Sequence, residues 1–354
     1  MKKTNCFLIR VGLIVLVVMS LGSCAGQEDE AANESVTTDS TQVTPTPPAT
    51  LDSLIEYTAD DLQQVENRAH FTLEYTWSYE STGDNHKAFY IPRDIEIGAS
   101  GEIYVLDTGN NRIQVFDSSR TYLRTLGEEG TAPGEFQMPQ DLMCIPPDQI
   151  LVTQPFQRRV QIITRAGEYV QGFVTEGTIS EATLFDDSTF IAPDSRRAGN
   201  SDHHLLRIHN FEGDYVRGVG RHKYVEESPS YALMGVHFAL DDVQNSYAGY
   251  FTRSHLEKYA PSGKLMQSIY FELSIKYEAK KRTLYDLEFS EGYFYVLVLN
   301  RHLTEKEILI GSSMATFSGG VAENTYYFMN HGVESEDTDL YRLLVFDQWG
   351  RLVS

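Results

Sequence analysis

One unit of sequence recurs at a constant interval in this chain. Three equivalent pairs are each separated by 47 residues: Pro92 and Pro139, Arg112 and Arg159, Tyr122 and Tyr169. Each unit holds four short runs rich in Val, Ile, Tyr and Phe, with turn residues between them. Such runs predict a four-stranded antiparallel meander, because β-branched and aromatic residues favour strands. Repeats of this length with four strands are typical of β-propeller blades.

The turn before the fourth strand of each unit sets the expected number of blades. It contains Arg120 in the first unit and a glycine in the later ones, at Gly167, Gly213, Gly263 and Gly350. The last interval is close to twice the others, so it holds either a degenerate unit or a long insertion. Counting a degenerate unit predicts an all-β, six-bladed propeller. We also expect residues 71–77 to add a strand that closes the ring, because closure removes a free sheet edge.

The first unit carries a motif that identifies the repeat type. Its sequence Asp107-Thr108-Gly109-Asn110-Asn111-Arg112-Ile113-Gln114-Val115-Phe116 resembles the core of an NHL repeat, as does the bridging stretch 127–136. We expect the Asn-Asn pair to adopt left-handed backbone angles in a tight turn. We expect the Arg112 head group to bond carbonyls or acids. The whole resembles six-bladed NHL/TolB-like propeller lipoproteins of Bacteroidota. No activity is generally assigned to that family, so the resemblance implies fold and location more than function.

The N-terminus predicts export and lipidation. Residues 1–23 combine a short basic region with an apolar stretch, and they end in Leu21-Gly22-Ser23 before Cys24. This ending resembles the bacterial lipobox, in which the cysteine is lipidated after cleavage. The alternative is an ordinary secretory signal with a chance cysteine. The resemblance implies an anchor in the cell envelope, at the outer membrane, facing either the periplasm or the outside.

A tether is predicted to join the anchor to the propeller. Residues 24–66 hold ten acids and no Lys or Arg, with clustered Thr and Pro at 44–48, which predicts disorder. Loosely helical apolar spacing indicates a short helix within residues 51–65. The propeller is then expected to span residues 67–354 as a monomer.

Charge and cysteine content restrict the partners and the chemistry. The net charge is −21, which argues against nucleic acid, since affinity for phosphate depends on Lys and Arg. It also disfavours anionic lipid, so contact with the membrane is expected through the lipid alone. Beyond Cys6 and Cys24 the chain has only Cys144, which rules out an internal disulfide in the body. Cys144 is expected to be a core residue.

Four acids are expected to line the central channel. Asp94, Asp141, Glu181 and Asp286 fall at similar places near the innermost strands of four units. A ring of carboxylates could bind Ca²⁺, which takes six to eight oxygen ligands. Alternatively, each carboxylate accepts backbone N–H bonds and locks the connection between blades.

Three functions are compatible with the sequence. The first is non-catalytic binding of a protein, peptide or glycan at the envelope. It is favoured because the chain has no G-x-S-x-G, Walker or His-Glu-x-x-His motif, and no catalytic residue is predicted. The alternative is a metal-dependent hydrolase or lyase, lactonase-like, with a cation in the channel. A third is a part of an envelope assembly that docks through residues 300–339.

Overall fold

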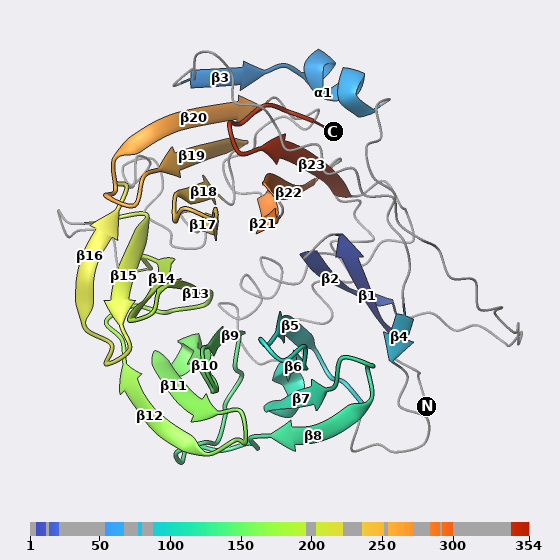
Figure 1. The fold of residues 1–354 in the computed structure, drawn as a ribbon, viewed down its shortest axis with the longest axis vertical. Coiled ribbons are helices and arrows are strands. Elements are labelled where there is room, and N and C mark those ends of the chain that lie inside the picture. Colours follow the sequence, from blue (N-terminus) through green and yellow to red (C-terminus); the bar gives the residue numbers. More distant parts are fainter. Residues whose placement is uncertain are drawn as a thin grey trace, which may run out of the picture.

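The chain forms a ring of antiparallel sheets (Figure 1). The computed structural model describes eleven segments: 5–11, 14–20, 54–66, 77–79, 88–195, 203–221, 236–250, 254–271, 284–290, 292–299 and 341–353. Within these, one α-helix, α1 (Ala59–Glu66), and two single 3-10 turns, η1 (Thr108–Asn110) and η2 (Pro155–Gln157), stand against the many strands. No helix among the described residues has the length and apolar character needed to cross a membrane.

Five sheets are propeller blades, each built from consecutive strands that run outward from the centre. The first two blades are β5 (Pro92–Ile97), β6 (Ile103–Asp107), β7 (Arg112–Phe116) and β8 (Tyr122–Leu126), then β9 (Asp141–Ile145), β10 (Gln149–Gln154), β11 (Arg159–Thr164) and β12 (Tyr169–Val174). The third and fourth are β13 (Thr183–Asp186), β14 (Thr189–Pro193), β15 (Leu206–Asn210) and β16 (Tyr215–Val219), then β17 (Val236–Leu240), β18 (Ser246–Tyr250), β19 (His255–Tyr259) and β20 (Leu265–Phe271). The fifth is β21 (Leu284–Ser290), β22 (Tyr293–Leu299) and β23 (Tyr341–Asp347).

The prediction of six blades is therefore wrong, and the long final interval explains why. β22 pairs directly with β23, so residues 300–340 are an insertion between the second and third strands of one blade. A short bridge from Leu352 to Phe346 stands where the fourth strand would be. The insertion itself, including the predicted docking element 300–339, lies outside the described residues.

A small additional sheet lies between blades 5 and 1 (Figure 1). It consists of β1 (Asn5–Val11), β2 (Ile14–Ser20) and β4 (Trp77–Tyr79), in the order β2-β1-β4. Of the predicted closing strand at 71–77, only Trp77 is described, and it pairs with β1. The sheet is not one of the repeats, because β1 and β2 precede the first repeat in the sequence. Both strands lie within residues 1–23, whose role as a signal peptide stays a prediction.

The turn before each fourth strand confirms the alignment of the repeats. Its residue has a positive φ in every blade, from 71° at Arg120 to 93° at Gly213. Glycine adopts such angles without a steric penalty, which accounts for its recurrence there. Gly213 also has no room for a side chain, because a Cβ would stand 2.4 Å from the Phe173 ring of the preceding blade.

The NHL-like motif is a buried hydrogen-bond network. Asp107, at 0% exposure, accepts through Oδ2 from Arg112 Nε at 2.8 Å, Asn110 Nδ2 at 2.8 Å and Gln114 Nε2 at 3.2 Å. Its Oδ1 accepts from the Tyr90 backbone N–H at 2.7 Å. Asn111 has φ 54°, as expected for the left-handed turn. The motif therefore fastens the chain that enters blade 1 to its second and third strands.

Hydrophobic clusters fill the spaces between neighbouring blades. Leu106 of blade 1 and Leu142 of blade 2 share one cluster, and Phe190 of blade 3 packs in the next. Cys144 is partly buried and packs against the edge of the first cluster, which agrees with the predicted packing role, and burial raises the pKa of its thiol to about 12. Such clusters join blade 1 to blade 2, 2 to 3, 3 to 4 and 4 to 5, so each repeat packs on the next one in the sequence.

The folded part begins earlier in the sequence than residue 67. β3 (Leu54–Tyr57) pairs in parallel with β20 and adds a fifth strand to blade 4, and α1 follows directly. The Tyr57 hydroxyl donates to the Gly350 carbonyl at 2.9 Å and accepts from the Leu352 N–H at 2.8 Å. The end of the predicted tether thus clasps blades 4 and 5 together, and the helix indicated within residues 51–65 is present.

Candidate functional site

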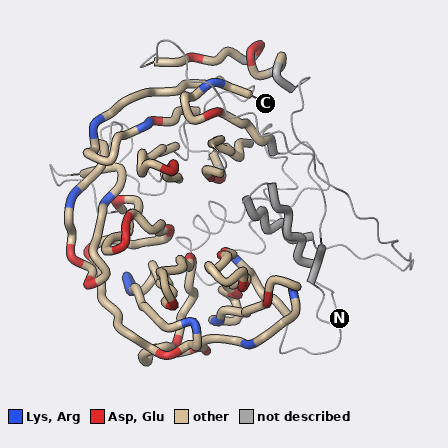
Figure 2. The backbone as a smooth tube through the Cα atoms, in the orientation of Figure 1, with Lys and Arg blue, Asp and Glu red and all other residues tan. Residues whose placement is uncertain are grey.

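Acidic residues occur on the inner strands around the centre of the ring (Figure 2). Asp94, Asp141 and Asp286 stand on the innermost strands β5, β9 and β21, and Glu181 lies just before β13. Two further acids that were not predicted as site residues, Glu96 and Glu288, follow two residues after Asp94 and Asp286 on the same strands. The signal was present in the repeated Asp-x-Glu spacing, since alternate strand residues share a face.

Three of these acids make contacts across the first three boundaries between blades, from blade 1 to blade 4. Asp94 Oδ2 accepts from the Leu142 N–H at 2.7 Å, and Asp141 Oδ2 accepts from the Ala182 N–H at 2.9 Å. Glu181 Oε2 lies 3.1 Å from Nδ1 of His237 on β17. Asp286 instead accepts from the N–H of its neighbour Leu287 at 2.9 Å. Asp94 and Asp141 thus show the locking role that was the alternative to cation binding.

Crowding of these carboxylates disfavours their charged forms. Burial raises the pKa of Asp94 to about 6 although two backbone amides lower it, and burial together with the Asp94 charge raises the pKa of Glu96 to about 7. Burial and Asp94 also raise the pKa of Asp141. Glu288 remains accessible to solvent, but the surrounding strands remove much of its hydration, and with Asp286 they raise its pKa to about 8.

The predicted calcium site gains no support from this geometry. In the part of the chain that the structure describes, no three His, Cys, Asp or Glu side chains are placed to hold a metal ion. Two of the four proposed ligands, Asp94 and Asp141, already bond to backbone amides. The cation site remains a prediction.

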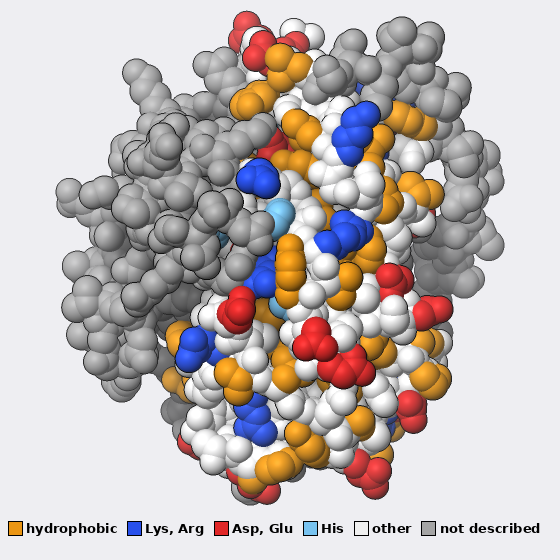
Figure 3. Space-filling model, turned by 90° about the vertical axis from the view of Figure 1, so that its left-hand side faces the viewer, with side chains coloured by type: hydrophobic (Ala, Val, Ile, Leu, Met, Phe, Trp, Pro, Cys, Tyr) orange, Lys and Arg blue, Asp and Glu red, His pale blue; other side chains and the backbone are white. Residues whose placement is uncertain are grey.

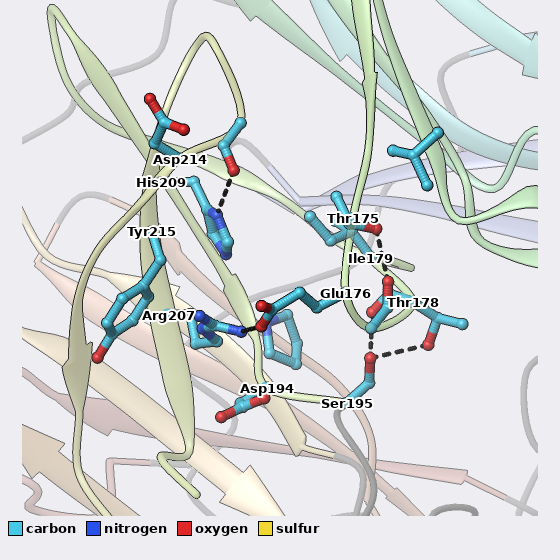
Figure 4. A pocket seen from close by; sticks show the side chains of 14 residues that line it. Thr175, Glu176, Thr178, Ile179, Asp194, Ser195, Arg207, His209, Asp214 and Tyr215 are labelled. Atoms are coloured by element: carbon cyan, nitrogen blue, oxygen red, sulfur yellow. Dashed lines mark hydrogen bonds and ion pairs between the residues drawn. The ribbon is translucent and has the colours of Figure 1, made fainter. Parts of the chain in front are cut away.

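A second candidate site is a hollow between blades 2 and 3 (Figure 4). Its volume is about 200 Å³. It is formed by the connection that follows β12, the end of β14, β15 and the turn into β16. Its polar lining residues are Thr175, Glu176, Thr178, Asp194, Ser195, Arg207, His209, Asp214 and Tyr215.

Arg207 is the central charged group of the hollow. Its side chain is 8% exposed, and Nη1 donates to Glu176 Oε2 at 3.2 Å, whereas the Glu176 side chain is 74% exposed. The guanidinium carbon lies 4.1 Å from the centroid of the Tyr215 ring. Nε of Arg207 is buried and has no hydrogen-bond partner among the described residues. The pair is thus a buried cation held by a solvent-exposed anion.

His209 forms a neutral wall beside Arg207. Its ring stacks on Phe190 with the centroids 5.5 Å apart, and its Nδ1 lies 3.3 Å from the Gly213 carbonyl oxygen. Burial lowers its pKa although the contact with Gly213 opposes this, so the ring is neutral at pH 7. An Nδ1 that donates to the carbonyl leaves Nε2 as an acceptor.

Short hydrogen bonds shape the opposite side of the hollow. Thr175 Oγ1 donates to the Gly177 carbonyl at 2.5 Å, and Thr178 Oγ1 donates to Ser195 Oγ at 2.9 Å. The Ser195 hydroxyl also donates to the Thr178 carbonyl. These bonds fix the connection that carries Glu176, so the hollow is built by the fold. None of its residues was predicted from the sequence.

The outer strands of three blades expose a repeated pair of large residues. At the start of successive outer strands these are Tyr169 and Val170, Tyr215 and Val216, and Leu265 and Met266. Figure 3 shows hydrophobic side chains among charged ones across this side of the ring. Scattered apolar surface of this kind is ordinary, so it does not by itself mark a binding site.

Comparison with known proteins supports the repeat type and the fold. Residues 89–116 match the NHL repeat model. A protein described as exported from Bacteroides fragilis NCTC 9343 is similar in structure, with a TM-score of 0.54, 12% identity, and coverage of 84% of this chain and 79% of that one. A member of the duf4221 family from Bacteroides vulgatus ATCC 8482 gives a TM-score of 0.54 at 11% identity, covering 76% and 82%. No curated protein matches the chain. The chain is an NHL-type β-propeller with the fold of these Bacteroides proteins.

Proposed function

We propose that the protein is a lipid-anchored binding propeller of the bacterial envelope, which takes its ligand in the hollow between blades 2 and 3. The observation that carries the proposal is Arg207, a buried cation at the centre of a hollow lined by polar side chains. Buried charge is costly unless it is paired. The ion pair with the exposed Glu176 leaves Arg207 Nε without a hydrogen-bond partner among the described residues, so the guanidinium has room for a further partner.

Asp94 and Asp141 in the channel have a structural role rather than a catalytic one. One carboxylate oxygen of Asp94 and one of Asp141 accept a hydrogen bond from a backbone N–H of the next blade. A catalytic acid or base must instead reach a substrate proton directly or through one water. These two residues are therefore assigned to the structure of the ring, and the ligand site is assigned to the hollow.

The location rests on the N-terminus. Lipidation at Cys24 would hold the acidic propeller at a membrane that its own charge does not attract. The chain between Cys24 and β3 would then serve as the spacer. Cys24→Ala is expected to release the protein from the membrane fraction into the soluble fraction, whereas unchanged fractionation contradicts the anchor.

Binding is tested with the full chain purified in detergent and applied to an array of envelope glycans and peptides. Thr178→Trp places a large side chain in the hollow, and Ser119→Trp makes the same change at an exposed turn of blade 1. We expect ligands that bind the wild type and the Ser119 variant to be lost with Thr178→Trp. Ligands that bind all three proteins equally would place the site elsewhere.

A further inference from the structure

The hydrogen-bonding capacity of Arg207 is only partly used. A guanidinium carries five N–H donors in a flat fork. In the structure Nη1 bonds a single Glu176 oxygen at 3.2 Å, and Nε has no hydrogen-bond partner among the described residues. A carboxylate matches this fork, because its two oxygens accept two parallel N–H bonds. The unmet demand in the hollow is therefore for an anionic, planar acceptor.

The neighbouring side chains add acceptors. The carboxylates of Asp194 and Asp214 line the hollow, and each already accepts one hydrogen bond at 3.2 Å, Asp194 Oδ2 from the His204 N–H and Asp214 Oδ2 from Asn210 Nδ2. The neutral His209 ring offers Nε2. Thr178 and Ser195 are bonded to each other and are less available. A ligand that meets Arg207 with a carboxylate must therefore carry several O–H donors elsewhere. A simple carboxylic acid lacks such donors, and the C-terminus of a peptide supplies backbone N–H donors that are spread along a chain rather than around one ring.

The volume of the hollow limits the ligand to a small unit. About 200 Å³ lies below the range of roughly 300–1,000 Å³ that holds drug-sized molecules, so one sugar ring is the appropriate scale. We propose that the hollow binds a uronic acid unit, whose carboxylate bonds Arg207 in place of Glu176 and whose hydroxyls donate to Asp194, Asp214 and His209. This inference rests on the proposed binding function and names its ligand class.

Glu176 then acts as a competing anion. Its carboxylate occupies the guanidinium in the free protein and, being 74% exposed, can swing into solvent at little cost in desolvation. Removing its charge frees the fork without altering the walls of the hollow. Glu176→Gln should therefore strengthen binding, a result that a purely structural ion pair would not give.

Calorimetric titration of the full chain in detergent tests the inference with three probes: D-galacturonate, D-galactose and N-acetylalanine. We expect galacturonate to bind at least about tenfold more tightly than the other two, since a bidentate charge-assisted pair is lost with galactose. Equal binding of galactose contradicts the carboxylate contact. Equal binding of N-acetylalanine contradicts the sugar.

Variants place the interaction on Arg207. Arg207→Lys keeps the charge but loses the fork, and it should weaken galacturonate about tenfold or more. Glu176→Gln should strengthen it severalfold, and the exposed Arg221→Gln is the matched control with unchanged affinity. If Arg207→Lys does not fold, Glu176→Gln decides alone, and unchanged affinity there overturns the inference. If the array instead yields a neutral ligand whose binding is lost with Thr178→Trp, the proposal of a uronic acid ligand is wrong. The proposed binding function of the hollow would still hold.

Discussion

Replacing Asp107 tests whether the NHL-like motif is a structural element. Asp107 is fully buried and accepts four hydrogen bonds, one of them from Arg112, which is itself 15% exposed. Asp107→Asn keeps the shape but removes the charge, and it turns an amide N–H₂ toward donors. Breaking a buried ion pair by changing one partner costs about 3–5 kcal/mol.

The loss is measurable as a change in thermal stability. For a domain of this size, about 1 kcal/mol corresponds to roughly 2–4 °C in Tm, so we expect a decrease of at least about 6 °C. The assay is calorimetry of wild type and variant at one scan rate, because unfolding of large proteins is often irreversible. Asp117→Asn is the control, since Asp117 accepts a single exposed turn bond from the Thr121 N–H. A Tm for Asp107→Asn within 2 °C of wild type would refute this role.

Three further predictions follow from the fold. A chain that begins at residue 67 lacks β3 and α1, and we expect its Tm to be lower than that of a chain that begins at residue 51, because it loses both hydrogen bonds of Tyr57. Equal Tm values by circular dichroism would show that β3 and α1 do not stabilise the propeller. Gly127→Ala should lower Tm by several degrees, because φ is 75° and a Cβ would stand 2.2 Å from the Phe136 ring; an unchanged Tm contradicts this close approach. The folded pKa of Glu96, about 7, lies above its usual 4.5, so stability should fall as pH rises from about 5 to 8, by at most about 3 kcal/mol for this group. In denaturant titrations, Glu96→Gln should make the free energy of unfolding depend less on pH over this range. A stronger dependence on pH would show that the pKa of Glu96 is not raised in the folded protein.

The repeat could be predicted from the sequence because local residue preferences determine its turns and strands. A turn that needs positive φ selects glycine, and Gly167, Gly213 and Gly263 therefore mark the fourth strands directly. The interval from Gly263 to Gly350 led to the wrong number of blades, because the pairing of β22 with β23 across the insertion depends on tertiary structure and has no local sequence signal. Turn spacing alone does not distinguish a lost blade from an inserted loop.

The clasp and the hollow show where local reasoning ends. Residues 54–57 lie in an acidic segment, and their strand exists because β20 supplies a partner edge. Glu176, Arg207 and Tyr215 come from separate connections and strands, and they meet only once blades 2 and 3 pack together. The inner acids were partly predictable, since their place at the start of each unit fixes their register.

Hydrogen–deuterium exchange of the full chain, with and without the strongest array ligand, tests the central claim most directly. If the hollow binds the ligand, exchange should slow in residues 174–179, 193–195 and 213–215, which border it. The inner strands β5, β9 and β21 should exchange as before. Protection confined to those inner strands would contradict the account and return the site to the central channel.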